Sequence, residues 1–290
     1  MEMEVLSGGL LTTIQDEGRF GCQKMGIPVS GAMDLDAYHA ANTLVGNQNH
    51  EAVLEMTLLG GRFRFSEDTV CAVTGADLQA RLGTQRVERY QAFPVQRGEE
   101  LSFGAAANGC RAYLAVAGGF DVPPVLGSRS TCRSCALGGW NGRALKTGDK
   151  IPVGTAKTAF SITEKAKIIR PPRYLSEITV RVIPGPQEYF FTEKGKADFY
   201  SEVYTVSPQS DRMGCRLEGP AVESFHGTDI ISDATVFGSI QITGAGLPIV
   251  LMADRQTTGG YAKIATVLYE DLPLLAQAVP GVRVHFKRVP

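Results

Sequence analysis

The chain of 290 residues is long enough for one large domain or two of ordinary size, and its 43% hydrophobic and 20% charged residues are typical of a soluble globular protein. A formal net charge of −1, with scattered Lys and Arg, argues against nucleic acid or an anionic membrane as a partner. No apolar run approaches the ~18 residues of a membrane span, the acidic N-terminus lacks a signal-peptide pattern, and six cysteines form no dense disulfide framework. We therefore expect a reduced cytoplasmic protein.

The first half of the chain has the pattern of short strands around one helix. Residues 5–14 predict a strand or pair of strands, and Gln15–Asp34 is a Gly-rich polar segment without strand or helix periodicity. Apolar residues then recur at helical spacing over Asp34–Val45, with Asp34 available as the N-cap. The segments that follow are β-rich and separated by Gly, Asp or Asn, which favours a barrel or sandwich over a parallel α/β sheet.

The strand pattern stops and restarts near the middle of the chain. We predict a first domain over residues 1–155, a Pro-containing linker over 156–176 and a second domain over 177–290. Within the second domain, Tyr189–Tyr200 and Asp271–Ala278 are expected to be helical.

A dense polar cluster between two apolar runs is the most informative stretch of the sequence. The runs Leu247–Ala253 and Ile264–Tyr269 have the length and composition of buried strands, so the pattern predicts strand–loop–strand. The residues between them are Asp254, Arg255, Gln256, Thr257, Thr258, Gly259, Gly260 and Tyr261. These groups can bind a small polar or anionic molecule, and the glycines let backbone N–H groups approach it. A solvated loop capped by its own side chains is an equally open alternative.

Three other polar loops follow strand-like runs. Ser128–Thr131 places Arg129 and Ser130 beside glycines, Asp211–Gly214 contains Arg212, and Gln15–Arg19 begins with Gln15 and Asp16. An Arg among hydroxyls can hold a carboxylate or phosphate, whereas adjacent opposite charges on a loop are more often structural. For each of the three loops, binding of an anionic group and a purely structural role both stay open.

The sequence lacks the motifs of several common metal, catalytic and cofactor sites. Cys132 and Cys135 form a lone CxxC without the further ligands of a zinc site, and the histidines have no ligand spacing, so we expect no metal. No GxSxG, GxxxxGK[ST] or strand-linked GxGxxG occurs, and no AMKM-like segment carries biotin. We therefore expect no covalently bound cofactor and no turnover by the chain alone.

Motifs along nearly the whole chain identify a family. They are TTIQDEGRFG (12–21), GIPVSGAMD (26–34), AANTLVGN (40–47), LEMTLLGG (54–61), VTGAD (73–77), YLAVAGGF (113–120), VLGSRST (125–131), GPQ (185–187), SDRMGCRLEG (210–219), SDATVFGSIQI (232–242) and PIVLMADRQTTGGYAKIATV (248–267). In this order they resemble the family of allophanate hydrolase subunit 2, also called KipA or the 5-oxoprolinase C subunit, which is related to the carboxyltransferase domain of urea carboxylase. Cys132-Arg-Ser-Cys135 is a local departure from the family pattern.

The resemblance implies a mainly β fold of two cyclophilin-like β-barrel domains with a few short helices. It implies a KipI-type partner (the 5-oxoprolinase B subunit) and a LamB/YcsF-type A subunit, with which the complex uses ATP to cleave 5-oxoproline to glutamate. The alternatives are a carboxyltransferase subunit that moves a carboxyl group from carboxybiotin, delivered by a partner, to urea or another amide, and a regulatory antagonist of a sensor-kinase inhibitor. In each enzymatic alternative the substrate is a small amide or lactam.

The candidate site combines the polar loops. We assign catalytic roles to Asp254, as acceptor for a substrate N–H, and to Arg255, as partner of a carboxylate or carboxyl-phosphate oxygen. The predicted substrate-binding residues are Gln256, Thr257, Thr258, Gly259, Gly260, Tyr261, Arg129, Ser130, Arg212, Gln15 and Asp16. We further predict that the loops of both halves converge on one cleft.

Overall fold

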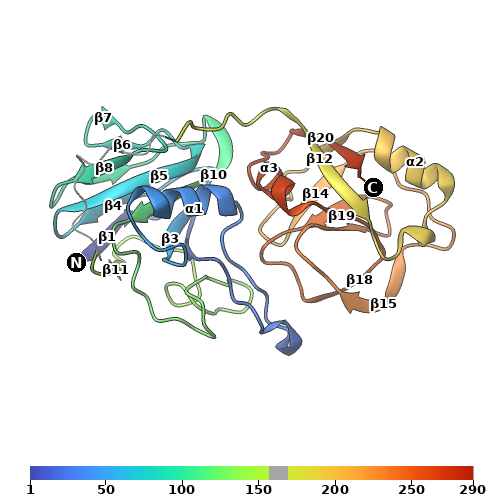
Figure 1. Ribbon diagram of the computed structural model, residues 1–290, viewed down its shortest axis with the longest axis horizontal. Coiled ribbons are helices and arrows are strands. Elements are labelled where there is room, and N and C mark those ends of the chain that lie inside the picture. The colour runs from blue at the N-terminus through green and yellow to red at the C-terminus, as the bar shows by residue number, and fades with distance from the viewer. Residues whose placement is uncertain (157–168, 290) are drawn as a thin grey trace. The chain divides into compact units, whose positions relative to one another are not determined.

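The computed structural model describes residues 1–156 and 169–289 (Figure 1). The chain forms two compact units, one made of Met1–Phe20 with Ser30–Arg173 and the other of Gly21–Val29 with Tyr174–Pro290. Most of the predicted linker, residues 157–168, lies outside the described residues, so the predicted domain limits at 155 and 177 stay a proposal.

The first unit contains two antiparallel sheets around one core. In spatial order, the first sheet consists of β11 (Lys150–Pro152), β1 (Glu2–Ser7), β4 (Arg62–Phe65), β9 (Glu100–Ser102), β6 (Arg81–Leu82) and β7 (Gln85–Arg86). The second consists of β2 (Leu11–Gln15), β3 (Val53–Thr57), β10 (Asn108–Val116), β5 (Thr69–Asp77) and β8 (Ala92–Val95). Phe63 of the first sheet and Leu54 and Leu114 of the second belong to the same buried cluster, so burial of apolar surface holds the two sheets together.

The predicted first helix is confirmed. Helix α1 spans Leu35–Leu44, and the Asp34 side chain accepts a hydrogen bond from the backbone N–H of Ala37 at 3.0 Å, which satisfies one of the free amides of the first turn. The buried face of α1, with Tyr38 and Ala41, joins a second apolar cluster on strands β5 and β10.

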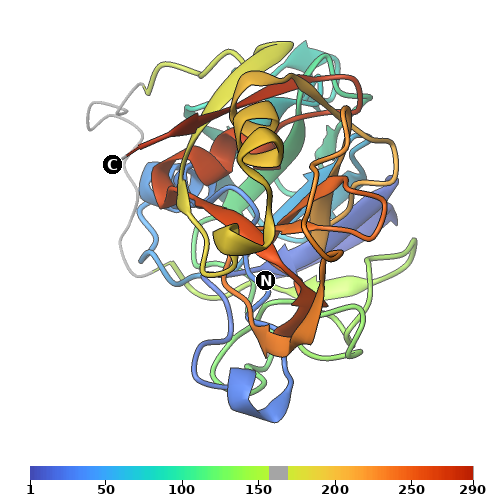
Figure 2. The same cartoon turned by 90° about the vertical axis from the view of Figure 1, so that its right-hand side faces the viewer.

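The second unit contains a closed β-barrel (Figures 1 and 2). Its strands run in the order β12 (Glu177–Pro184), β19 (Lys263–Val267), β16 (Ser239–Ile242), β17 (Pro248–Leu251), β14 (Gly214–Glu218), β13 (Tyr204–Val206) and β20 (Arg283–Arg288). The parallel pairing of β12 with β20 closes the barrel. Along β12 the buried residues Ile178, Val180 and Val182 alternate with exposed ones, as a barrel wall requires.

Two helical predictions in the second unit need correction. The segment predicted as one helix over Tyr189–Tyr200 is a 3₁₀ turn η2 (Glu188–Phe190) followed by α2 (Glu193–Ser201). The break occurs because Thr192 is extended and caps α2, with its hydroxyl accepting from the backbone N–H of Gly195 at 2.9 Å. The predicted Asp271–Ala278 helix is shorter, since η3 (Tyr269–Asp271) precedes α3 (Leu272–Ala276). A further 3₁₀ turn, η1, spans Gln23–Met25.

The polar cluster departs from a simple strand–loop–strand. Strands β17 and β19 both pair with β16 and not with each other, so the chain must cross between them. It does so through a turn at Asp254–Thr257 and then β18 (Thr258–Tyr261), which pairs with β15 (Asp229–Ala234) in a two-stranded β15–β18 ribbon. The prediction of a loop is therefore wrong for the second half of the cluster, because pairing with β15 holds its two glycines extended.

Candidate functional site

A buried ion pair anchors the start of the polar cluster in the second unit. The guanidinium of Arg212 contacts both carboxylate oxygens of Asp254, with Nε–Oδ2 at 2.9 Å and Nη2–Oδ1 at 3.0 Å. The two side chains are only 6% and 8% exposed. The backbone N–H of Asp254 also donates to the carbonyl of Arg212 at 2.8 Å. The predicted site residues Arg212 and Asp254 thus lie together, and Asp254 is occupied in holding Arg212.

Arg255 is a buried cation that forms no ion pair within the described part of the chain. It is 7% exposed, its Nη1 donates weakly to the Met252 carbonyl at 3.4 Å, and its Nε has no hydrogen-bond partner there. Its guanidinium lies over the ring of Phe237, 5.6 Å from the centroid. Burial lowers the pKa of Arg255 to about 10, which leaves it protonated at neutral pH.

Side-chain amides pack tightly against the glycines of β18. Gln256 Nε2 donates to Gln241 Oε1 at 3.3 Å, and Gln241 Nε2 donates to the carbonyl of Tyr261 at 3.1 Å. A Cβ at Gly259 would lie 2.5 Å from Gln241 Nε2 and 3.2 Å from Gln256 Nε2, so only glycine fits without displacing an amide. At Gly260 the nearest atom would be 3.7 Å away.

The remaining predicted residues of this cluster have mixed environments. Thr257 and Gly260 are partly buried, whereas Thr258 and Tyr261 are exposed. The backbone carbonyl of Thr257 accepts from the N–H of Thr235 at 3.1 Å, which ties the turn to the chain beyond β15.

Three polar side chains that were not among the predicted site residues are hydrogen-bonded to one another beside the β15–β18 ribbon. Lys263, at the start of β19, donates from Nζ to Asp233 Oδ2 at 2.7 Å and to the carbonyl of Ala234 at 3.0 Å. Gln187 Nε2 donates to the same Asp233 oxygen at 3.2 Å, and Gln187 Oε1 accepts from the backbone N–H of Lys263 at 3.2 Å. Gln187, Asp233 and Lys263 lie in three of the motifs that carried the family resemblance: GPQ, SDATVFGSIQI and the long last motif. Their place in these motifs was the one indication in the sequence that they could be functional.

The polar loops of the first unit form a separate network centred on Asp16. Its Oδ1 accepts from the hydroxyls of Ser128 and Ser130 and from the backbone N–H of Gly18, and its Oδ2 accepts from the backbone N–H of Arg129. Asp16 is 6% exposed, and Ser128 and Ser130 are almost fully buried. The predicted residues Asp16, Arg129 and Ser130 are therefore neighbours, in an arrangement that fixes the loop.

Two further side chains complete this network. Gln15 is buried and donates from Nε2 to the Thr131 carbonyl at 3.2 Å. Arg129 donates from Nε to the Val122 carbonyl at 2.9 Å and pairs with Asp121 at 3.3 Å, so its side chain points to its own loop. The predicted convergence of Arg129, Arg212 and Arg255 on one cleft joins residues of different units and stays a prediction.

The CxxC directly follows the polar loop Ser128–Thr131 of the first unit. Cys132 and Cys135 are free thiols, and the Ser134 hydroxyl lies 3.5 Å and 3.8 Å from their respective sulfurs. Burial raises the pKa of Cys135.

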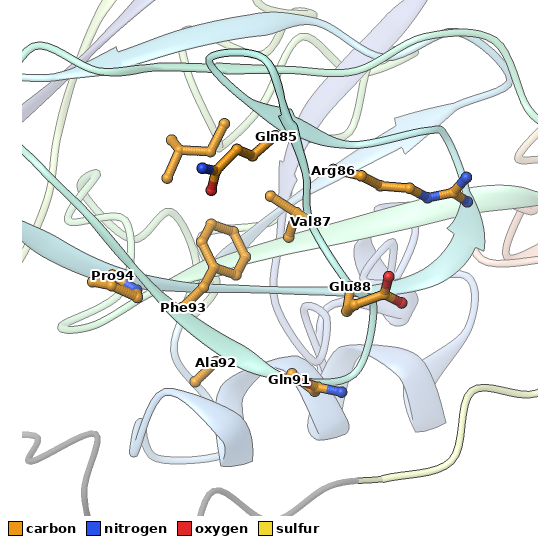
Figure 3. A pocket seen from close by; sticks show the side chains of 9 residues that line it. Gln85, Arg86, Val87, Glu88, Gln91, Ala92, Phe93 and Pro94 are labelled. Atoms are coloured by element: carbon orange, nitrogen blue, oxygen red, sulfur yellow. The ribbon is translucent and has the colours of Figure 1, made fainter.

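A hollow of about 290 Å³ beside β7 and β8, lined by residues that include Val87 and Phe93, contains none of the predicted site residues (Figure 3).

Within residues 1–156 and 169–289, no three His, Cys, Asp or Glu side chains are grouped as a metal site would need. Over the same residues, none of the helices has the length and apolar character needed to cross a bilayer.

The carboxyltransferase domain model, covering its subdomains A and B, matches residues 25–288. The chain belongs to the carboxyltransferase domain family. It is 38% identical over 284 residues to the 5-oxoprolinase C subunit of Escherichia coli, covering 98% of this chain and 90% of that protein. Identity to the 5-oxoprolinase C subunit of Haemophilus influenzae is 37%, with 99% and 91% covered.

A solved carboxyltransferase relative has the same fold. The crystal structure of K. lactis urea amidolyase superposes with a TM-score of 0.90 at 31% identity, over 100% of this chain and 19% of that much longer one. The family resemblance in the sequence is thus confirmed, and so is a mainly β, cyclophilin-like fold with few short helices.

Proposed function

We propose that this chain is the C subunit of a multi-subunit 5-oxoprolinase that uses ATP to open 5-oxoproline to L-glutamate. The observation that carries the proposal is the match, over nearly the full length of both chains, to two proteins named as 5-oxoprolinase C subunits. Its partners would be a KipI-type B subunit and a LamB/YcsF-type A subunit. Because the sequence has no familiar nucleotide loop, ATP would be bound by a partner, and the chain alone would have no turnover.

The charge at Arg255 supports an anionic substrate. A cation that is 7% exposed, with an unsatisfied Nε and no ion pair among the described residues, carries a desolvation cost that a bound anion would offset. The substrate 5-oxoproline has a carboxylate, whereas urea is neutral. We assign Arg255 to that carboxylate, and Gln256, Thr257, Thr258 and the Gly259–Gly260 amides to the remainder of the ligand.

For Asp254 we propose a different role from the one expected. Both of its carboxylate oxygens accept from Arg212, so we assign Asp254 to positioning Arg212 and the following turn. In the first unit, the polar network would keep its loop in shape; its predicted members are Gln15, Asp16, Arg129 and Ser130. These residues would contact a substrate only if the loops of both units converge on one cleft, which is a separate proposal.

The test is the Arg255→Met variant in the complex with both partner subunits. We expect at least a tenfold rise in KM for 5-oxoproline, because a charge-assisted contact is lost. Since the pKa of Arg255 is depressed from 12.5 to about 10, protonated Arg255 opposes folding at neutral pH. Its removal should therefore raise the free energy of unfolding by up to about 3 kcal/mol.

Arg216→Met is the matched control, because Arg216 lies on β14 in the same unit and is exposed. It should change neither KM nor stability appreciably. An unchanged KM in Arg255→Met would rule out the assignment of Arg255 to the substrate carboxylate.

The second candidate function is carboxyl transfer from carboxybiotin, delivered by a partner, to urea or another amide. It is favoured by the superposition on urea amidolyase. In this second function, Arg255 would bind the carboxyl group while it is transferred from carboxybiotin to the amide. The two functions are distinguished by supplying the complex with 5-oxoproline and ATP but no biotinylated protein: glutamate formation supports the first, and a strict need for biotinylated carrier supports the second. A regulatory antagonist would bind its partner and tolerate substitution of Arg255.

A further inference from the structure

Asp233 is a carboxylate that the second unit presents to solvent beside the polar cluster. Its side chain is 50% exposed, in contrast with 8% for Asp254. Its Oδ1 accepts from the backbone N–H of Ala234 at 2.8 Å, while Oδ2 accepts from Lys263 Nζ at 2.7 Å and from Gln187 Nε2 at 3.2 Å. The carboxylate is thus held in one orientation while part of it remains open to a ligand.

Lys263 is a buried ammonium adjacent to this carboxylate. Its side chain is 3% exposed, and lysine is rarely buried without a partner. Among the described residues, Nζ donates to Asp233 and to the carbonyl of Ala234, which accounts for two of its three N–H groups. An acceptor and a donor, 2.7 Å apart, therefore lie side by side.

The strand opposite Asp233 has no side chain at the paired position. Asp233 is the β-partner of Gly259, and a side chain at Gly259 would have to displace the amide of Gln241. The neighbouring Gly260 also lacks a side chain, and a Cβ there would meet its nearest atom, the carbonyl oxygen of Ile230, at an ordinary contact distance of 3.7 Å. Backbone without a side chain therefore lies across the ribbon from the fixed carboxylate of Asp233.

We propose that Asp233 and Lys263 bind the cis-amide edge of the substrate, with Asp233 accepting its N–H and Lys263 donating to its C=O. This inference rests on the proposed function and adds the residues that recognise the amide. A lactam or cyclic urea presents N–H and C=O on the same edge, which matches an adjacent carboxylate and ammonium. Asp233 takes the role first expected of Asp254, whose oxygens both bind Arg212. A carbonyl that gains negative charge during ring opening would be stabilised by Lys263.

The test uses the full chain and a pair of neutral probes. The first, 2-pyrrolidinone, has the cis-amide N–H, and the second, N-methyl-2-pyrrolidinone, lacks it. Binding is followed by backbone amide chemical shifts, with Gly259 and Gly260 as reporters. We expect 2-pyrrolidinone to shift these signals and to bind about 10- to 100-fold more tightly than its N-methyl form, the size expected for one hydrogen bond to a charged group.

Variants separate recognition from folding. Asp233→Asn and Lys263→Met should abolish the preference for the N–H lactam, and Lys263→Arg should restore part of it. Asp229→Asn is the control, because Asp229 lies exposed on the same strand β15 and should keep the full preference. A thermal melt of each variant reports on folding. A purely structural role would change the melt of Asp233→Asn but would leave the ratio between the two probes intact.

The outcomes also separate this inference from the proposed function. Equal binding of both probes to the wild-type chain, or no shift at Gly259 and Gly260 up to the solubility limit, would overturn the cis-amide assignment even if the complex cleaves 5-oxoproline. A clear N–H preference in a chain whose complex does not cleave 5-oxoproline would uphold the assignment and reject the 5-oxoprolinase function.

Discussion

The Arg212–Asp254 pair offers the sharpest test of what the polar cluster needs in order to fold. Asp254→Ala removes the carboxylate that faces Nε and Nη2 of Arg212, in a place where both side chains are less than a tenth exposed. Removing one partner of a buried ion pair costs about 3–5 kcal/mol, since the remaining buried charge loses that carboxylate. For a chain of this size that corresponds to a fall in Tm of roughly 6–20 °C.

The assay is a thermal melt of Asp254→Ala beside a surface pair of similar geometry. Arg62 and Glu100 also form a two-point ion pair, at 2.7 and 3.0 Å, but Arg62 is 54% exposed. Glu100→Ala should lower Tm by only a small fraction of the Asp254→Ala shift, because water screens the exposed pair. Equal shifts in the two variants would refute the idea that burial gives Asp254 its structural role. A wild-type Tm together with lost activity in Asp254→Ala would return Asp254 to catalysis.

Three further predictions concern the glycines, pH and the isolated chain. Gly259→Ala should fold but lower substrate affinity at least tenfold, because its Cβ would displace the Gln241 amide, whereas Gly260→Ala should bind normally; titration calorimetry of both variants tests this. Hydrogen bonds from Arg143 lower the pKa of Asp149 from 3.8 to about 2, so about 2 kcal/mol of stability present above pH 4 should disappear between pH 4 and 2. Urea melts should show a flatter pH profile for Asp149→Asn. The purified chain should hydrolyse neither ATP nor 5-oxoproline; turnover matching that of the complex would contradict the partner requirement.

Local patterns predicted the elements whose causes are local. Asp34 before an apolar helical repeat correctly marked the start of α1, since an N-cap acts on the amide three residues along. The apolar runs around Pro248–Leu251 and Lys263–Val267 were correctly predicted as strands. Strand β18 was missed, because its two central glycines disfavour a strand and it is held extended by its pairing with β15.

The site was only partly predictable because its contacts are distant in sequence. Arg212 and Asp254 were both chosen as candidates, but their pairing joins residues 42 positions apart, which no single stretch reveals. Lys263 and Asp233 lie 30 positions apart, and the sequence analysis singled out neither of them. They come together where β19 of the barrel lies beside β15 of the ribbon, so their joint chemistry becomes visible in the fold alone.

The proposed 5-oxoprolinase function is tested most directly by reconstituting the complex with and without this chain. The KipI-type and LamB/YcsF-type partners from the same source are mixed with 5-oxoproline and ATP, and glutamate is measured over time. We expect ATP-dependent glutamate formation only when the wild-type chain is present, with a large reduction when it carries Arg255→Met. Full activity from the two partners without this chain, or none with it, would contradict the account.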